Sequence, residues 1–203
     1  YRQIMYAFIQ GLMMASLQLT HNPILNSSAQ LLILPVNSAG LLLDPILTRA
    51  KTLYPDNYQR YYRACRDGSL MVGSCLLHKR IREQAGLSVS SNGNQPSYIA
   101  NLVISDHSHH PVRVRWLTAA LIDLRQQLTT LIRYQGIRHI ALLARPLIYN
   151  HSRNEANPST NESLITNALP LDWHIDILPL ITHYLANLPK LRIDIHVPRD
   201  VAI

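Results

Sequence analysis

The stretch ILPVNSAGLLLDPI, Ile33 to Ile46, contains the end of a strand, a loop and the start of a helix. The apolar run 31–36 predicts a strand buried on both faces, as in a parallel sheet. Pro45 favours a helix that begins there and runs to about residue 51. The loop between them has the position of a ligand loop. It contains one glycine, Gly40, whereas a loop that cradles phosphate normally contains several.

The rest of the chain alternates between strand and helix patterns. Strands are expected at residues 17–20, 71–78, 98–104, 137–144 and 191–197, and helices at 54–68, 117–136 and 171–188, the last with Asp172 as its cap. Polar residues at 79–97 and 150–168 predict loops. A helix between two strands implies a right-handed crossover and parallel pairing. The order therefore predicts an α/β fold, a three-layer α/β/α domain with a mixed, mostly parallel central sheet.

The length and composition are those of a single domain. The chain has 203 residues and 47% hydrophobic content, enough to bury a sizeable core. We expect one domain at residues 17–203 and an N-terminal extension at residues 1–16, with a packed first helix as the alternative for the extension. The apolar run Ile4 to Ser16 is shorter than the roughly 20 residues that span a bilayer, so no membrane partner is predicted.

The charge and cysteine content restrict the partners and the compartment. The net charge is +7, carried by sixteen Arg and three Lys, which suits a nucleic acid or a nucleotide; a dispersed, solvated set of Arg is the alternative. We interpret the tyrosines of 54–68 as packing residues, with a base-stacking surface as the alternative. Cys65 and Cys75 form no CxxC motif, so a reduced, cytoplasmic protein without a metal or cofactor is expected.

Three phrases resemble the macro domain family, and specifically the branch typified by the DarG antitoxin, which removes ADP-ribose from DNA. They are YPDNYQRYYRACRDGSLMVGSCLL (54–77), YIANLVISDH (98–107) followed by GIRHIALLA (136–144), and LDWHIDILPLI (171–181). The likeness extends over about residues 17–198. It implies the α/β/α macro fold and ADP-ribose, or a nucleotide-like molecule, as the ligand. A shared fold does not establish a shared activity, so the ligand positions are carried over one at a time.

The resemblance assigns ligand-binding roles to residues after the first two strands. Asn22 stands where the family has an Asp or Asn that hydrogen-bonds the adenine amino group, although an Asn that closes a turn before Pro23 explains it equally well. Asn37 stands where the family has the Asn that faces the distal ribose and the reaction centre. Ser38, Ala39 and Gly40 follow it in the family register.

The chain departs from the family pattern where phosphate should bind. The family's Gly-x-Met-Gly-Lys-Gly reads GLLLDP here, so Leu43 and Pro45 replace glycines and Asp44 replaces the Lys. Pro45 has no N–H to donate. Asp44 adds a negative charge, and like charges about 4 Å apart repel by roughly 4 kcal/mol at an effective dielectric near 20.

The remaining family positions have also changed. Ser105 stands where the resemblance places a catalytic Lys. The second phosphate loop contains no glycine, so that Arg145 or Arg153 is the candidate anion ligand there. The neighbouring segment DHSHHP (106–111) favours a solvated or DNA-facing loop over a metal site.

Two hypotheses follow from these positions. The first is a catalytically degenerate macro-like module that binds a protein or nucleic-acid partner, or a nucleotide-like ligand in an altered pocket. The second is an ADP-ribosyl hydrolase acting on DNA or protein in which Asn37 and His107 position a water.

Overall fold

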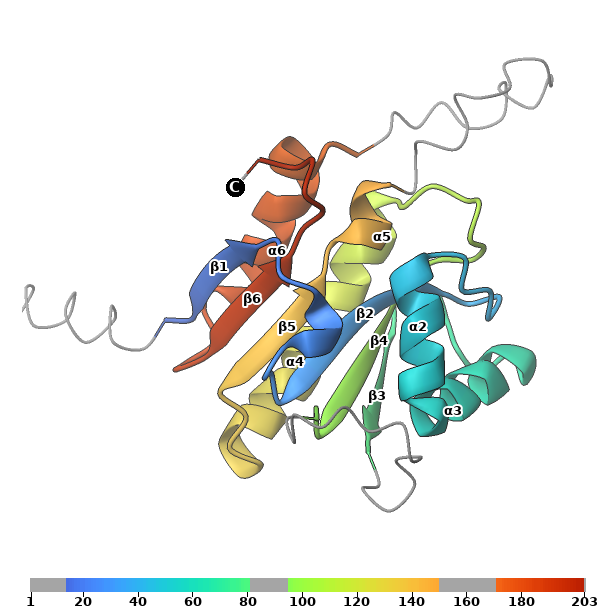
Figure 1. Cartoon of the computed structure of the whole chain (residues 1–203), viewed down its shortest axis with the longest axis horizontal. Helices are drawn as coiled ribbons and strands as arrows, with labels where there is room; N and C mark the ends of the chain where they lie inside the picture. Colours follow the sequence, from blue (N-terminus) through green and yellow to red (C-terminus); the bar gives the residue numbers. More distant parts are fainter. Residues whose placement is uncertain (1–13, 81–94, 150–170, 203) are drawn as a thin grey trace, which may run out of the picture.

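The structure is a computed structural model that describes residues 14–80, 95–149 and 171–202. The expected loop at 150–168, residues 1–13 of the expected extension and residues 81–94 of the expected loop at 79–97 lie outside these residues. The described part contains one sheet with the strand order β1-β6-β5-β2-β4-β3 (Figure 1). The strands are β1 Ser16–Thr20, β2 Leu31–Asn37, β3 Cys75–Lys79, β4 Tyr98–Ser105, β5 His139–Leu143 and β6 Arg192–His196.

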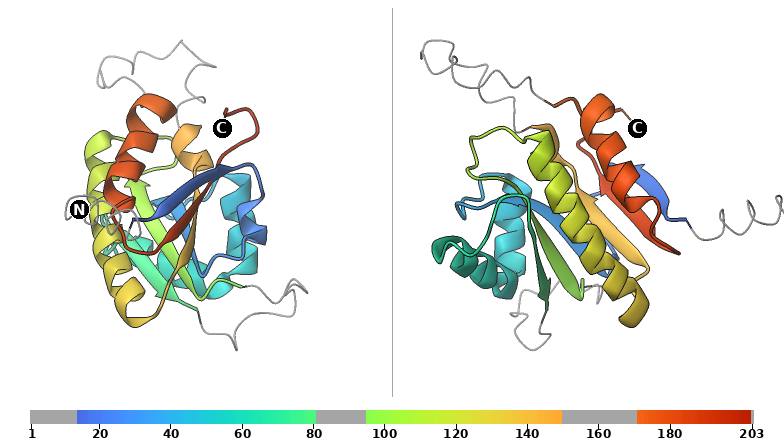
Figure 2. Two further views of the ribbon diagram at one scale, coloured as in Figure 1. Left: turned by 90° about the vertical axis from the view of Figure 1, so that its left-hand side faces the viewer. Right: turned by 180° about the vertical axis from the view of Figure 1, so that it is seen from behind.

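Neighbouring strands of the sheet are parallel except for β3, which runs antiparallel to β4. The helices cover both faces. α4 (Val114–Tyr134) and α6 (Leu178–Leu185) lie across one face, as Figure 2 shows from behind, and α2 (Pro45–Leu53), α3 (Pro55–Arg66) and the short η1 (Ile24–Asn26) cover the other. The predicted three-layer fold with a mixed, mostly parallel sheet is therefore confirmed.

The central strand β2 is buried along its whole length. It pairs with β4 from Leu31 to Asn37 but with β5 only as far as Ile33. Pro35 thus lies beyond the part of β2 that has partners on both sides, where a missing N–H is tolerated. A register shift between Val36 and Asn37 sets Asn37 opposite Ser105 of β4. Irregularities of this kind re-aim side chains at the end of a strand.

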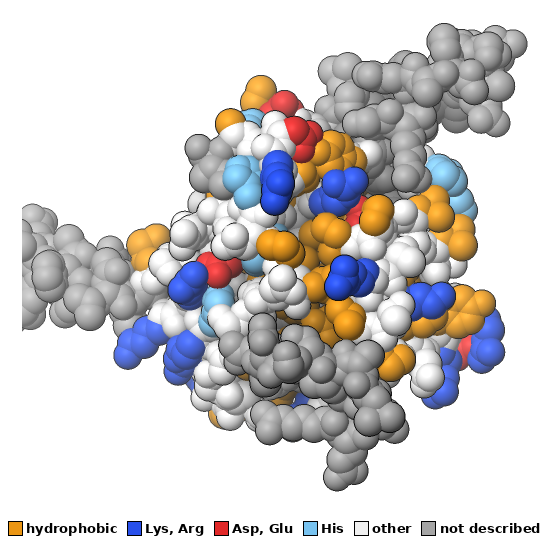
Figure 3. All heavy atoms as spheres, viewed as in Figure 1, with side chains coloured by type: hydrophobic (Ala, Val, Ile, Leu, Met, Phe, Trp, Pro, Cys, Tyr) orange, Lys and Arg blue, Asp and Glu red, His pale blue; other side chains and the backbone are white. Residues whose placement is uncertain are grey.

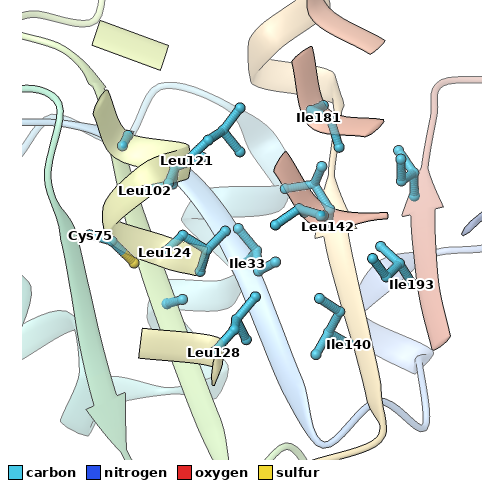
Figure 4. Close-up of a cluster of buried hydrophobic side chains, with 14 of the residues drawn as sticks. Ile33, Cys75, Leu102, Leu121, Leu124, Leu128, Ile140, Leu142, Ile181 and Ile193 are labelled. Atoms are coloured by element: carbon cyan, nitrogen blue, oxygen red, sulfur yellow. The ribbon is translucent and has the colours of Figure 1, made fainter. Parts of the chain in front are cut away.

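Each face of the sheet has its own hydrophobic core. Behind the sheet, leucines of α4 such as Leu124 and Leu128 pack on Ile33, Leu102 and Ile140 (Figure 4). In front, a second core joins α2, α3 and η1 to the opposite side chains of the same strands. Because a strand alternates its side chains between faces, the unbroken apolar runs of the sequence supply both cores.

Several boundaries differ from the sequence-based expectations. Strand β1 begins at Ser16, β3 begins at Cys75 because 71–74 forms a turn, and the helix expected at 54–68 begins at Pro55, directly after α2, because a residue that precedes Pro avoids the helical conformation. The expected helix at 171–188 consists of a π-turn, η4 (Trp173–Ile177), and α6. Its predicted cap is confirmed, since Asp172 accepts hydrogen bonds from the backbone N–H groups of residues 174 and 175 at 2.7 and 2.8 Å.

Candidate functional site

The candidate site is a cavity of about 280 Å³ at the carboxyl ends of β2, β4 and β5. Ends of parallel strands meet at one edge of a sheet, and ligands of α/β proteins bind there. The loop before α2 and the short α5 (Arg145–Ile148), which follows β5, complete the walls. Figure 1 shows α2 and α5 on either side of this edge. Most of the lining is apolar: Pro35, Val36, Leu41, Leu43, Pro45, Leu47, Ile104 and Pro146.

Asn37 lines the cavity, but its side chain closes the loop that follows it. The amide Nδ2 donates to the Leu41 carbonyl at 2.5 Å, and Oδ1 accepts from the Leu41 N–H at 3.2 Å. The backbone carbonyl of Asn37 accepts a 2.6 Å hydrogen bond from the Tyr61 hydroxyl, and burial raises the pKa of that hydroxyl. Asn37 is thus held from both sides, and its amide is committed within the protein.

The next three candidate residues do not line the cavity. Ser38 donates its N–H to the Ser105 carbonyl at 3.0 Å, and Ala39 is exposed. Gly40 has φ +77°, and a Cβ added to it would lie 3.2 Å from Tyr62 of α3. The conformational freedom of this glycine therefore lets the loop pack closely on α3.

Asp44 and Arg145 form an ion pair across the cavity wall. The Nε of Arg145 donates to Oδ2 of Asp44 at 2.9 Å, while Oδ1 of Asp44 caps α2 by accepting from the N–H groups of Ile46 and Leu47 at 2.8 and 3.3 Å. The guanidinium also stacks on the Tyr149 ring, 4.8 Å from its centroid. A helix N-terminus attracts anions, and here the carboxylate of the protein occupies it. The two charged side chains that the sequence singled out, Asp44 and Arg145, are thus bound to each other.

The turn after β4 supplies the third wall. Ser105 is buried, lines the cavity and donates its hydroxyl to the His107 carbonyl at 3.0 Å. His107 does not belong to the lining, whereas Ser108 and His109 do. The Ser108 hydroxyl oxygen is buried and forms no hydrogen bond within the described part of the chain. The structure thus places the histidine-rich turn at the cavity, with Ser108 and His109 in the lining instead of the candidate His107, because neighbouring residues of a turn point in different directions.

The side chains of Asp106 and His110, at the far side of the same turn, contact each other and fix the shape of the turn. His110 Nδ1 lies 2.7 Å from Asp106 Oδ1, and the His110 hydrogen bond holds the pKa of Asp106 below its usual range despite the opposing effect of burial. Within residues 14–80, 95–149 and 171–202, no three His, Cys, Asp or Glu side chains gather in a way that could hold a metal ion. The same part of the chain contains no helix with the length and hydropathy of a membrane span.

Asn22 lies away from these residues. It is exposed, and its backbone carbonyl accepts from His196 Nδ1 at 2.6 Å. It belongs to a second pocket on the outer strands β1 and β6, whose lining shares no residue with the first cavity. The structure thus brings together Asn37, Ser105 and Arg145 but not Asn22.

Comparison with known proteins supports the macro fold. No protein-family model matches the chain. A curated relative, the DNA ADP-ribosyl glycohydrolase of Thermus aquaticus, is 29% identical over 108 residues, which cover 53% of this chain and 27% of that protein. The match thus extends over about a quarter of the relative.

Solved structures give the same result over most of the chain. The macrodomain of Thermus aquaticus DarG superposes with a TM-score of 0.64 at 22% identity, covering 91% of this chain and 99% of that one. Thermosipho africanus DarTG in complex with ADP-ribose superposes with a TM-score of 0.65 at 21% identity, covering 93% and 43%. The chain has a macrodomain fold that resembles DarG, as its sequence phrases predicted.

Proposed function

We propose that this chain, which has the fold of the DarG macrodomains, binds a nucleotide-like ligand through its uncharged nucleoside part, in an altered and catalytically degenerate pocket. The Asp44–Arg145 ion pair carries the proposal. The pair places the Asp44 carboxylate at the N-terminus of α2, where a phosphate would otherwise be attracted. It also engages the Arg145 guanidinium, so that this cation is not free to bind the phosphate. An incoming pyrophosphate would have to displace Asp44 and would meet its charge.

The rest of the cavity suits an uncharged ring. Its leucine, isoleucine and proline side chains can pack on the faces of a nucleoside, while the Ser108 hydroxyl and the His109 ring offer polar contacts at one side. A few polar groups in a mostly apolar pocket are typical of small-molecule sites. The ADP-ribose of the Thermosipho africanus complex contains such a nucleoside part.

The catalytic groups of a hydrolase are engaged elsewhere. The Asn37 amide hydrogen-bonds Leu41 through both its nitrogen and its oxygen, and the Ser105 hydroxyl donates a hydrogen bond to the His107 carbonyl. Neither can activate a water in this arrangement. The alternative, an active ADP-ribosyl hydrolase, would depend on His109, whose imidazole lines the cavity.

Calorimetry with adenosine, ADP-ribose and inorganic pyrophosphate tests the proposal, together with a turnover assay on ADP-ribosylated single-stranded DNA. We expect adenosine to bind at least as tightly as ADP-ribose, pyrophosphate to bind weakly, and no release of ADP-ribose. A Leu43→Asp variant, which adds charge to the apolar lining, should lose adenosine binding. Turnover that disappears in both Asn37→Ala and His109→Ala would support the hydrolase instead.

A second candidate function, nucleic-acid binding, rests on the outer face of α3. The rings of Tyr58 and Tyr62 stack with centroids 5.7 Å apart, and Lys51 Nζ lies 4.2 Å from the Tyr58 centroid. Tyr62 is 48% exposed, and Arg63 and Arg66 are exposed beside it. Tyr54 and Tyr61 are buried, as the packing interpretation expected, but Tyr58 and Tyr62 are not. Figure 3 shows Lys and Arg side chains at the lower right, the side of the molecule on which α3 lies in Figure 1.

A stacked aromatic pair flanked by cations, with Tyr62 exposed and Tyr58 half-buried, fits the bases and phosphates of a single strand. Affinity for a single-stranded oligonucleotide should fall steeply as salt rises, and Tyr62→Ala should weaken it by about 1–3 kcal/mol. Tyr134→Ala, which removes an exposed ring at the end of α4, is the matched control. Equal losses in both variants, or affinity that does not change with salt, would exclude this surface.

A further inference from the structure

The second pocket lies on the outer strands β1 and β6, under the segment that contains η1, and has a volume of about 380 Å³. On these strands Leu17, Leu19, Ile193 and Ile195 face the core behind the sheet. The alternate residues therefore face the front, and they are polar: Gln18, Thr20, Arg192, Asp194 and His196. In Figure 1 α2 and α3 cover the other end of the front face. This pair of strands thus presents a polar surface to the pocket.

His196 lies at this surface and is 6% exposed. Its Nδ1 is 2.6 Å from the Asn22 carbonyl oxygen. A carbonyl can only accept, so Nδ1 carries the proton and Nε2 of the neutral ring carries a lone pair. Burial lowers the pKa of His196, which keeps the ring neutral. Nε2 is buried and has no hydrogen-bond partner among the residues that the structure describes, and an acceptor in this state carries a desolvation cost that a donor would offset.

The ionised groups beside His196 are already satisfied. Arg192 donates to both oxygens of Asp194, at 2.9 and 3.0 Å, and His139 Nε2 lies 2.8 Å from the same carboxylate. Asp194 is buried, and its neighbours hold its pKa below the usual range against the effect of desolvation. Among the described residues of the lining, Arg192 and Asp194 are the only Lys, Arg, Asp or Glu side chains, and their charges cancel. The pocket thus needs a neutral ligand with a hydrogen-bond donor.

We propose that this pocket binds a neutral, polyhydroxylated molecule of monosaccharide size, one hydroxyl of which donates to His196 Nε2. The volume is at the small end of the range for ligand sites, roughly 300–1,000 Å³. The rim adds the Thr20 hydroxyl and the side-chain amide of Asn26. Apart from Pro23, the lining formed by the described residues contains no apolar side chain and no Phe, Tyr or Trp ring, which disfavours a nucleobase. The site is separate from the cavity of the proposed function.

Nuclear magnetic resonance tests this site directly, with the histidine ring signals followed while D-ribose or D-glucose is added. We expect a saturable shift of the His196 signals in the millimolar range. His196→Asn is the informative variant because its amide nitrogen can still donate to the Asn22 carbonyl while the Nε2 lone pair is lost. It should bind the sugar at least about tenfold more weakly, a difference of about 1.4 kcal/mol.

Two further variants separate the outcomes. Asn26→Ala, at the exposed rim, should weaken binding without touching the buried groups, so the test stands even if His196→Asn fails to fold. Ser108→Ala, in the other cavity, should leave sugar binding unchanged. The proposal is wrong if the His196 signals do not move, if His196→Asn binds normally, or if ribose 5-phosphate binds more tightly than ribose.

Discussion

Replacing Asp44 by Asn isolates the charge that separates this cavity from a phosphate site. Asn caps a helix about as well as Asp, so the hydrogen bonds to the N–H groups of residues 46 and 47 can persist. The variant loses the 2.9 Å ion pair and frees Arg145. Only the electrostatics at the N-terminus of α2 change.

The geometry sets the size of the expected effect. Two unit charges about 4 Å apart interact by roughly 4 kcal/mol at an effective dielectric near 20. The Arg145 side chain is 38% exposed and that of Asp44 is 14% exposed, so solvent screens part of this energy. With about half of it remaining, a phosphate ligand gains about 2 kcal/mol, or roughly 30-fold in affinity.

Calorimetry measures this gain directly. Asp44→Asn should bind ADP-ribose and pyrophosphate about 10- to 100-fold more tightly than the unchanged chain, and adenosine with unchanged affinity. Asp67→Asn is the matched control, because it removes one exposed carboxylate outside the cavity, where Asp67 pairs with Arg66 at 3.2 Å. If both variants gained affinity for phosphate equally, the gain would come from the change in net charge alone. No gain in Asp44→Asn would refute the role assigned to the ion pair.

Three other predictions concern the fold around the two pockets and in the core. Gly40→Ala should lower the free energy of unfolding, measured by urea denaturation, by about 2 kcal/mol, because the added Cβ contacts Tyr62 and the residue has a positive φ. Gly68→Ala is the control: its φ is also positive but nothing lies within 4 Å, so it should lower the free energy of unfolding by only about 1 kcal/mol. Burial lowers the pKa of His196 from its ordinary value of 6.5. Its contribution to stability is therefore complete above pH 6.5 and is lost as the pH falls through the folded-state pKa. His196→Asn should flatten the fall in melting temperature between about pH 6.5 and 5. Leu124→Ala, in a core position 1% exposed, should cost about 2–5 kcal/mol without altering either binding site, and a cost below about 1 kcal/mol would contradict the packing in Figure 4.

The strands and long helices could be predicted because their signals are local. The strand β2 is indicated by six consecutive apolar residues at 31–36, and α4 is indicated by leucines that recur on one helical face. Short elements such as η1 and α5 lack a period and were missed. The position of Asp44 before Pro45 is also a local signal, since Asp at the cap and Pro in the first turn are typical of a helix start.

The candidate site could be predicted only as a set of positions. Asp44 and Arg145 are 101 residues apart in the chain, so nothing in either neighbourhood indicates that they pair. Gly40 looked like a remnant of a phosphate loop, but its close neighbour is Tyr62 on α3. His196 carries no motif, and it becomes notable only because the fold buries it beside Asn22 and Asp194.

The contacts made by the residues that replace the family's glycines and Lys indicate whether the cavity has decayed or has been remodelled. A site that loses its ligand without replacement would leave charged groups unpaired and gaps unfilled, at a cost in stability. Here Asp44 caps a helix and neutralises Arg145, Pro45 occupies the first turn of α2, and Leu41 and Leu43 contribute to the lining. The residues that oppose phosphate in the proposed function, Asp44 and Pro45, are the same ones that build a well-formed helix start. The proposed function interprets this as a pocket selective for an uncharged group, and the Asp44→Asn titration distinguishes that from simple loss, because a decayed cavity would bind phosphate no better after the charge is removed.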